Sequence, residues 1–216
     1  MDPLAEKYYY ISPYAYCGNN QVMYVDPNGK EKIRAYDRTD PRNANLIKAA
    51  NNFKDDKNTI NIWAHGNSES ILIFYDKTGT QQTITNFKYF ETFLNKNSKL
   101  WQSRGKDEQM TIVLHSCETG QELYNKQKSI ARQISKLKNT TIIAPNQYLA
   151  FDSNGEIGVF EATIKEDKII LGEEARWIEY NNGEQTNTYR GNSKQGSESE
   201  RESLSPFWQM ILNLAK

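Results

Sequence analysis

Cysteine and histidine are scarce in this chain, which has two of each among its 216 residues: Cys17, Cys117, His65 and His115. The two cysteines lie far apart in the sequence, so we expect free thiols, as in a reducing cytoplasm, rather than a disulfide framework. Zinc sites usually show tight ligand pairs such as Cys-x-x-Cys, and the sequence has none. We therefore expect no metal and no other cofactor, and any mechanism that needs an imidazole must use His65 or His115.

Net charge and long apolar runs are also lacking. The 27 Lys and Arg residues balance 27 Asp and Glu residues, so the chain has no general attraction for nucleic acid or an anionic membrane. No apolar run approaches the roughly 20 residues of a membrane-spanning helix, and the first residues show no signal-peptide pattern. We expect neither a nucleic-acid partner nor a membrane span, and we expect any export to use a dedicated secretion system.

The length suffices for one α/β domain with short appendages. Strands and helices are predicted to alternate, which favours a mostly parallel sheet with helices on both faces. Residues 193–204 are predicted to be a flexible linker, and residues 205–216 a short amphipathic helix. The predicted strands are 33–36, 60–64, 71–75, 82–85, 110–114 and 140–144, the helices 43–53, 87–100 and 123–137, and the C-terminal β-hairpins span 159–189.

Two of the predicted strands each end in one reactive side chain, His65 in one case and Cys117 in the other. In a parallel sheet the carboxyl ends of strands lie along one edge, so these two side chains are expected to meet. The thiol of Cys117 is the candidate nucleophile, and His65 is the candidate base and acid. The backbone N–H groups of Gly66 and Cys117 are candidate oxyanion donors, each contributing about 2.7–4 kcal/mol to transition-state stabilisation. The pair predicts a cysteine peptidase.

Other residues near these strand ends are candidates to line a substrate cleft: His115, Ser116, Asp152 and Glu156. In an extended strand, His115 faces the same side as Cys117, so it competes with His65 as the base or lines the cleft. The simpler interpretation of His115, which we favour, is a half-buried histidine hydrogen-bonded to backbone. Asp152 or Glu156 would select a basic substrate side chain. The non-catalytic alternative is an inert core thiol at Cys117 and a turn histidine at His65.

The first thirty residues differ from the rest in their density of tyrosine and turn residues. Residues 2–9, 12–20 and 25–29 closely resemble the end of the repeat-associated core of Rhs (YD-repeat) proteins. In that family the core forms a β-cocoon, and a variable C-terminal domain, commonly a toxin against a competing cell, follows an Asp-Pro-x-Gly motif. The resemblance implies that residues 1–30 are a remnant of this core. Asp2 and Asp26 match aspartates of the family's self-cleavage site, but the rest of that site is absent, so they are assigned no catalysis.

Two further runs resemble motifs of the caspase-like cysteine peptidases, which include the CHAT, clostripain and gingipain groups. In residues 62–66 an apolar strand ends in His-Gly, and in residues 112–117 an apolar strand ends in a small residue and cysteine. Residues 116–120 are especially similar to the CHAT-type motif, and the whole resemblance covers about residues 32–165. It implies a three-layer α/β sandwich with a mostly parallel central sheet, a peptidase domain of residues 31–192, and His65 and Cys117 as its catalytic dyad. His115 departs from the clan, which has an apolar or small residue there.

The two resemblances together imply an Rhs effector that is exported, cleaves proteins in the cytoplasm of a recipient cell and meets a cognate immunity protein. A variant is a peptidase that cuts its own polypeptide. Two other classes of function stay open: a catalytically silent caspase-like domain that binds a target or immunity protein, and a toxin of unrelated chemistry such as a nuclease. The balanced charge and the lack of clustered acidic and histidine metal motifs weigh against the nuclease.

Overall fold

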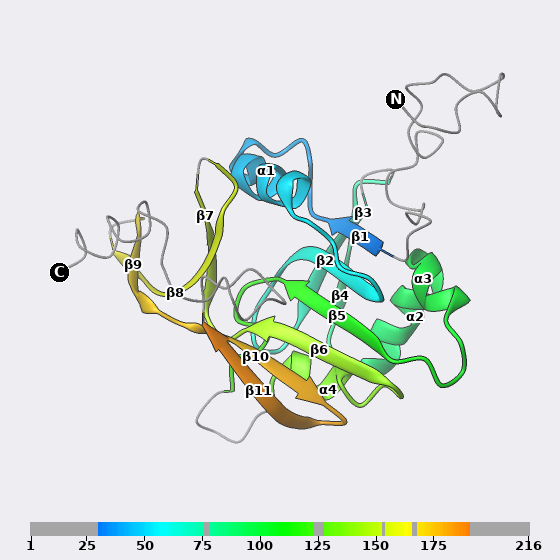
Figure 1. Ribbon diagram of the computed structural model, residues 1–216. Coiled ribbons are helices and arrows are strands. Elements are labelled where there is room, and N and C mark those ends of the chain that lie inside the picture. Colours follow the sequence, from blue (N-terminus) through cyan, green and yellow to red (C-terminus); the bar gives the residue numbers. More distant parts are fainter. Residues whose placement is uncertain (1–29, 76–77, 123–127, 153, 166–167, 191–216) are drawn as a thin grey trace, which may run out of the picture.

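The computed structural model describes residues 30–75, 78–122, 128–152, 154–165 and 168–190, and its largest unit is a mixed eight-stranded sheet (Figure 1). The strands lie in the order β11-β10-β6-β5-β2-β3-β4, and β1 pairs with β2 outside this path. Their bounds are β1 (Lys30–Ala35), β2 (Thr59–Gly66), β3 (Ile71–Tyr75), β4 (Thr80–Ile84), β5 (Met110–His115), β6 (Thr140–Pro145), β10 (Arg176–Asn181) and β11 (Glu184–Arg190).

A second sheet and several short helices complete the described part. The second sheet is antiparallel, in the order β7-β8-β9, and consists of β7 (Tyr148–Phe151), β8 (Ile157–Lys165) and β9 (Lys168–Glu174). The α-helices are α1 (Ala44–Asn52), α2 (Phe87–Asn97), α3 (Lys99–Ser103) and α4 (Ile130–Ile134), and a 3-10 turn, η3 (Pro41–Asn43), precedes α1. The predicted α/β class is therefore confirmed.

Parallel pairing is confined to the middle of the large sheet. Strands β1, β2, β5 and β6 pair in parallel, whereas the β3/β4 hairpin on one side and the β10/β11 hairpin on the other pair antiparallel. The β10/β11 hairpin turns at Asn182 and Gly183, which both have positive φ (49° and 78°) as a tight two-residue turn requires. The expectation of a mostly parallel sheet was wrong at these flanks, because strands joined by short turns pair antiparallel.

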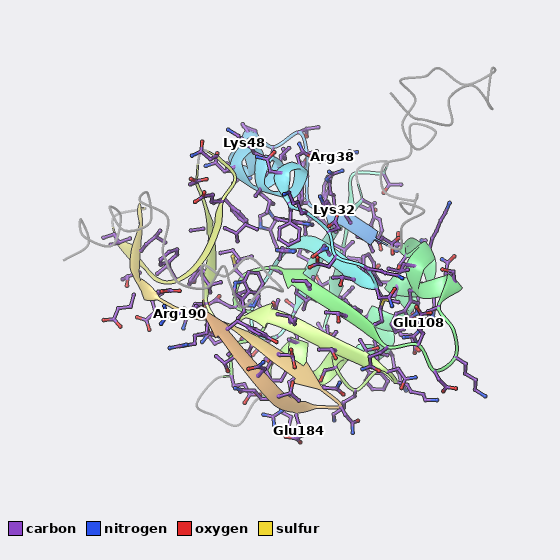
Figure 2. The ribbon with its side chains drawn as sticks, viewed as in Figure 1. Lys32, Arg38, Lys48, Glu108, Glu184 and Arg190 are labelled. Carbon is purple, nitrogen blue, oxygen red and sulfur yellow. The ribbon has the colours of Figure 1, made fainter. Side chains whose placement is uncertain are left out.

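The central strands are apolar because both of their faces are covered. The first six residues of β2 are all buried, as are five of the six residues in β5 and in β6. On one face, Ile62, Leu114 and Ile142 pack with side chains of α2, α3 and α4. On the other face, Trp63 packs with α1, and Val113 and Ile143 pack with the small sheet. Charged side chains such as Lys48, Glu108 and Glu184 lie at the periphery (Figure 2).

Two of the predicted helices differ from those observed, and one observed strand was not predicted. The helix predicted over 87–100 is two helices, because Ser98 is extended (φ −114°, ψ 117°) and its side chain caps α3 by accepting from the N–H of Trp101. The helix predicted over 123–137 is also different. Residues 123–127 are not among the described residues, and the observed helix α4 begins only at Ile130, after the capping residue Ser129. Strand β7 was not predicted, since its four residues follow Pro145 closely and show no alternation of buried and exposed positions.

Several predictions fall on segments outside the described residues. These are the Rhs-like segment up to residue 29 with Cys17, the linker predicted over 193–204 and the helix predicted over 205–216. Within the described ranges, no helix is long and apolar enough to span a membrane.

Candidate active site

His65 and Cys117 are positioned by two strands that pair directly. Strands β2 and β5 are parallel neighbours, and their last matched residues are Trp63 and His115. His65 lies two residues beyond Trp63, still within β2 and paired with Leu72 of β3, and Cys117 lies two residues beyond His115, in the turn after β5, so both are at the carboxyl ends of these strands. The side chain of His65 is exposed and that of Cys117 is half-buried. The structure thus brings the two reactive residues to one edge and leaves both within reach of solvent.

The turn after β5 is held in place by the end of β6. The N–H of Glu118 donates to the Gln147 carbonyl (2.9 Å), and the N–H of Gly120 donates to the Pro145 carbonyl (2.8 Å). Gly120 allows this close approach, because a Cβ there would lie 2.8 Å from the Ala144 carbonyl oxygen. These contacts fix the backbone that follows Cys117, and strand β5 fixes the backbone that precedes it.

Gly66 lies tightly against the residue before Cys117. A Cβ on Gly66 would collide with the Ser116 hydroxyl and would lie 2.9 Å from the Ser70 carbonyl oxygen. The N–H of Asn67 donates to that same carbonyl (3.0 Å). Because hydrogen-bonded and non-bonded pairs alternate along an antiparallel ladder, Gly66, paired with Ile71, falls at a non-bonded position. Its N–H therefore faces away from β3, toward the side on which β5 ends.

The surroundings of the Cys117 thiol favour its protonated form. Its sulfur accepts a hydrogen bond from the Leu149 N–H at 3.4 Å, at the start of β7. Burial raises the pKa of the thiol, and the negative charge of Glu118 raises it further, while the Leu149 N–H acts in the opposite direction. A thiol in this setting needs a base to remove its proton before it can attack.

His115 lies in the core rather than along an open cleft. It is 2% exposed and stacks on Trp63, with ring centroids 3.9 Å apart. Its Nε2 faces Asn61 Oδ1 at 3.0 Å, so the bonding partner is a side-chain amide and not the backbone we expected. Burial, together with the charge of Lys32, lowers the pKa of His115 to about 3. The imidazole is therefore neutral near pH 7, and its burial shields it almost completely from solvent.

The remaining predicted cleft residues occupy different places. Ser116 is buried against Gly66. Asp152 is 1% exposed, and its carboxylate accepts from the N–H groups of Asn154 (2.8 Å) and Glu156 (2.7 Å), so it holds its own loop together. This loop packs on α1, where the Asn52 amide donates to the Asn154 carbonyl at 2.9 Å. The Glu156 side chain is exposed on the same loop.

Three residues near Cys117 were not predicted. Glu118 follows the cysteine directly, and Tyr148 and Leu149 come from β7, whose backbone reaches the sulfur. The negative charge of Glu118 is the main cause of a raised pKa at Tyr148, with smaller contributions from burial and Cys117. The position of Glu118 after the cysteine was a signal available in the sequence. The approach of β7 was not, because it depends on how a second sheet packs.

Within the described ranges, no group of three or more His, Cys, Asp or Glu side chains is arranged to hold a metal ion.

A family model described as a domain of unknown function, DUF8616, matches residues 32–159. This range contains β2, β5 and both reactive residues. No curated protein matches the chain.

Proposed function

The chain belongs to DUF8616, a family whose description assigns no activity, and we propose that its domain is a caspase-like cysteine endopeptidase. Cys117 is the nucleophile and His65 the general base and acid. The observation that carries this proposal is the direct parallel pairing of β2 and β5, from which both side chains emerge at one rim. The three-layer packing, with helices on one face and α1 and a small sheet on the other, is compatible with the caspase-like sandwich.

The proposed reaction begins with transfer of the Cys117 proton to His65. The thiolate then attacks the carbonyl carbon of a peptide bond, and the N–H groups of Gly66 and Cys117 stabilise the resulting oxyanion. Collapse of this intermediate breaks the C–N bond, and the His65 imidazolium gives its proton to the departing amine. Water, deprotonated by His65, hydrolyses the thioester, releases the acid and restores the thiol.

The biological setting that we propose is that of an Rhs effector. It rests on the resemblance of residues 1–30 to the end of an Rhs core. Such an effector would be exported by a dedicated secretion system, cleave proteins in the cytoplasm of a recipient cell and be blocked by an immunity protein.

A binding domain without catalysis is the second candidate. What favours it is the setting of the thiol, since burial and the Glu118 charge both raise the pKa of Cys117. A base close to the sulfur is required to overcome this, so the role of His65 separates the two candidates.

The test uses the full chain expressed in the bacterial cytoplasm. Cys117→Ala and His65→Ala should each restore growth and remove newly formed protein N-termini, lowering cleavage by about a thousandfold or more. Cys17→Ala is the matched thiol control and should leave both readouts unchanged. If Cys117→Ala stays fully toxic, catalysis is rejected and the binding domain is favoured. If His115→Gln restores growth while remaining folded and His65→Ala does not, the base is misassigned.

A further inference from the structure

The first two backbone N–H groups of α4 bond to both of the loops that carry the candidate catalytic residues. The N–H of Ile130 donates to the Ser68 carbonyl (2.8 Å), in the loop after β2, and the N–H of Ala131 donates to the Thr119 carbonyl (3.0 Å), in the turn after β5. The N–H groups in the first turn of a helix have no partner within the helix, so they can bond to other segments. The position of α4 therefore links the position of one loop to that of the other.

Helix α4 depends on side-chain contacts to stay in this place. It has five residues, capped by Ser129, and a helix of this length is not stable without tertiary contacts. The Arg132 side chain supplies such contacts to three groups. Its Nη1 donates to both carboxylate oxygens of Glu122 (2.9 and 3.0 Å), its Nη2 to Oε2 of Glu184 (2.8 Å), and its Nε to the Gly183 carbonyl (2.7 Å). One guanidinium thus joins α4 to the segment after the β5 turn and to the β10/β11 turn.

The β10/β11 hairpin, which lies beside α4 (Figure 1), contacts the same region at two further points. The N–H of Gly183 donates to the hydroxyl of Ser135 (3.0 Å), the residue after α4, and the Tyr180 hydroxyl donates to the Gly120 carbonyl (2.8 Å). Both hydrogen bonds are buried and neither involves Arg132. Removal of the Arg132 guanidinium should therefore loosen α4 without unfolding the domain.

We propose that Arg132 is a positioning residue for the catalytic dyad: it holds α4 where the first two N–H groups of that helix fix the separation of the loops that carry His65 and Cys117. This inference rests on the proposed peptidase function, and Arg132 acts through α4 rather than by contact with substrate. Proton transfer from a thiol to an imidazole requires the two groups to lie within hydrogen-bond reach. A displacement of about 1 Å between the loops would therefore slow the reaction while leaving peptide binding nearly unchanged.

The first measurement is of kcat and KM for the purified full chain, on a fluorogenic peptide chosen from a random library for its cleavage by the natural chain. Arg132→Ala should lower kcat by about tenfold to a hundredfold and change KM little. Arg132→Lys keeps the charge but lacks the planar fork that bonds three groups at once, so it should recover only part of the lost rate. A purely structural role would lower the midpoint of thermal unfolding and leave kcat of the folded protein unchanged.

The matched control is another arginine with structural contacts. Arg104 stacks on Trp101 (3.2 Å to the ring centroid) and donates to the Lys138 carbonyl (3.4 Å), near the start of β6 and so at the opposite end of the parallel strands from the rim. Arg104→Ala should leave kcat unchanged. Thermal unfolding of each variant defines an assay temperature at which all of them are folded.

A second measurement does not need peptide cleavage. It follows the alkylation of Cys117 by iodoacetamide near pH 7 in a Cys17→Ala background, in which Cys117 is the only cysteine. His65→Ala should slow alkylation, because the imidazole assists formation of the reactive thiolate. The same change should have a smaller effect in Arg132→Ala, in which the two groups are already separated. The difference between the two effects measures how far Arg132 couples His65 to Cys117.

The outcomes separate this inference from the proposed function. If cleavage depends on Cys117 but folded Arg132→Ala keeps the natural kcat, or Arg104→Ala loses as much, the positioning inference is overturned and the peptidase stands. If no peptide is cut in a Cys117-dependent way but alkylation shows the coupling, the peptidase fails and the positioning role stands. If there is neither cleavage nor an effect of His65 on alkylation, no dyad exists and both proposals fail.

Discussion

The buried imidazole of His115 ends a chain of polar contacts that runs from the core to the edge of the sheet. Its Nε2 contacts Asn61 Oδ1 (3.0 Å), the Asn61 amide donates to Asp55 Oδ1 (2.8 Å), and Asp55 pairs with Lys32 (3.4 Å). Because the Asn61 oxygen is an acceptor, Nε2 carries the imidazole proton. Phe53 and Trp177 pack edge-on against the ring, so a second proton would place a charge among aromatic side chains.

This burial makes stability depend on pH. The pKa of His115 is lowered from 6.5 to about 3, so between these values the unfolded chain binds more protons than the folded one. The stabilisation is complete above pH 6.5 and is lost as the pH falls toward 3, with a total loss of about 5 kcal/mol. We expect urea unfolding at pH 7 and pH 4 to show this loss.

The variant His115→Gln isolates the effect, because its amide can still donate to Asn61 while it does not titrate. Its unfolding free energy should depend less steeply on pH than that of the natural chain. His65→Gln, at an exposed histidine, is the control and should retain the natural slope. Equal slopes for the natural chain and His115→Gln would show that His115 does not cause the acid sensitivity.

At the scale of elements, two of the central strands begin in the same way. Asn58 precedes β2 and Asn139 precedes β6, and both have a φ of 55°. Their carbonyls accept hydrogen bonds from the first residues of β5: the Thr111 N–H donates to Asn58 (3.1 Å) and the Met110 N–H to Asn139 (3.0 Å). These two asparagines, with their left-handed backbone conformation, help to set the register of β2, β5 and β6. That register decides which residues reach the rim of the sheet.

Substitution at Asn58 tests this role of the backbone. Asn58→Gly should be nearly neutral because glycine adopts positive φ without strain, whereas Asn58→Ala should lower the free energy of unfolding by about 1–2 kcal/mol. Urea denaturation of the two variants gives the difference directly. At Asn51, inside α1, the order of stability should be the opposite: Asn51→Ala should be more stable than Asn51→Gly, because alanine favours a helix and glycine disfavours it. Equal stability of Asn58→Gly and Asn58→Ala would contradict the proposed importance of the left-handed start.

The sequence was informative where structure depends on local pattern. Apolar runs predicted β2, β5 and β6, and the positions of His65 and Cys117 at the ends of two of these runs predicted that both lie near the carboxyl ends of strands. The break at Ser98 was missed because the apolar spacing continues through it, although Ser98 both ends α2 and caps α3. The burial of His115 and the approach of β7 to Cys117 depend on packing between distant segments, which periodicity does not encode.

For the whole molecule, the large sheet divides into a shielded centre and open edges. Strand β5 is covered on both faces and is paired with β2 and β6, whereas β11 ends the sheet and six of its seven side chains are exposed. The rim with His65 and Cys117 belongs to the shielded centre. The proposed catalytic residues are therefore carried by strands that are covered on both faces, and we expect this part of the fold to open least.

Amide hydrogen exchange of the full chain, followed by mass spectrometry, tests this division. Peptides from β5 should exchange only through global unfolding, and destabilising the protein with urea should speed their exchange in parallel with the fall in unfolding free energy. Peptides from β11 should exchange faster through local opening and should respond little to low urea, because opening an edge strand exposes little buried apolar surface. Exchange in β5 as fast as in β11, with the protein folded, would mean that the rim is mobile and that the dyad needs substrate or a partner to assemble.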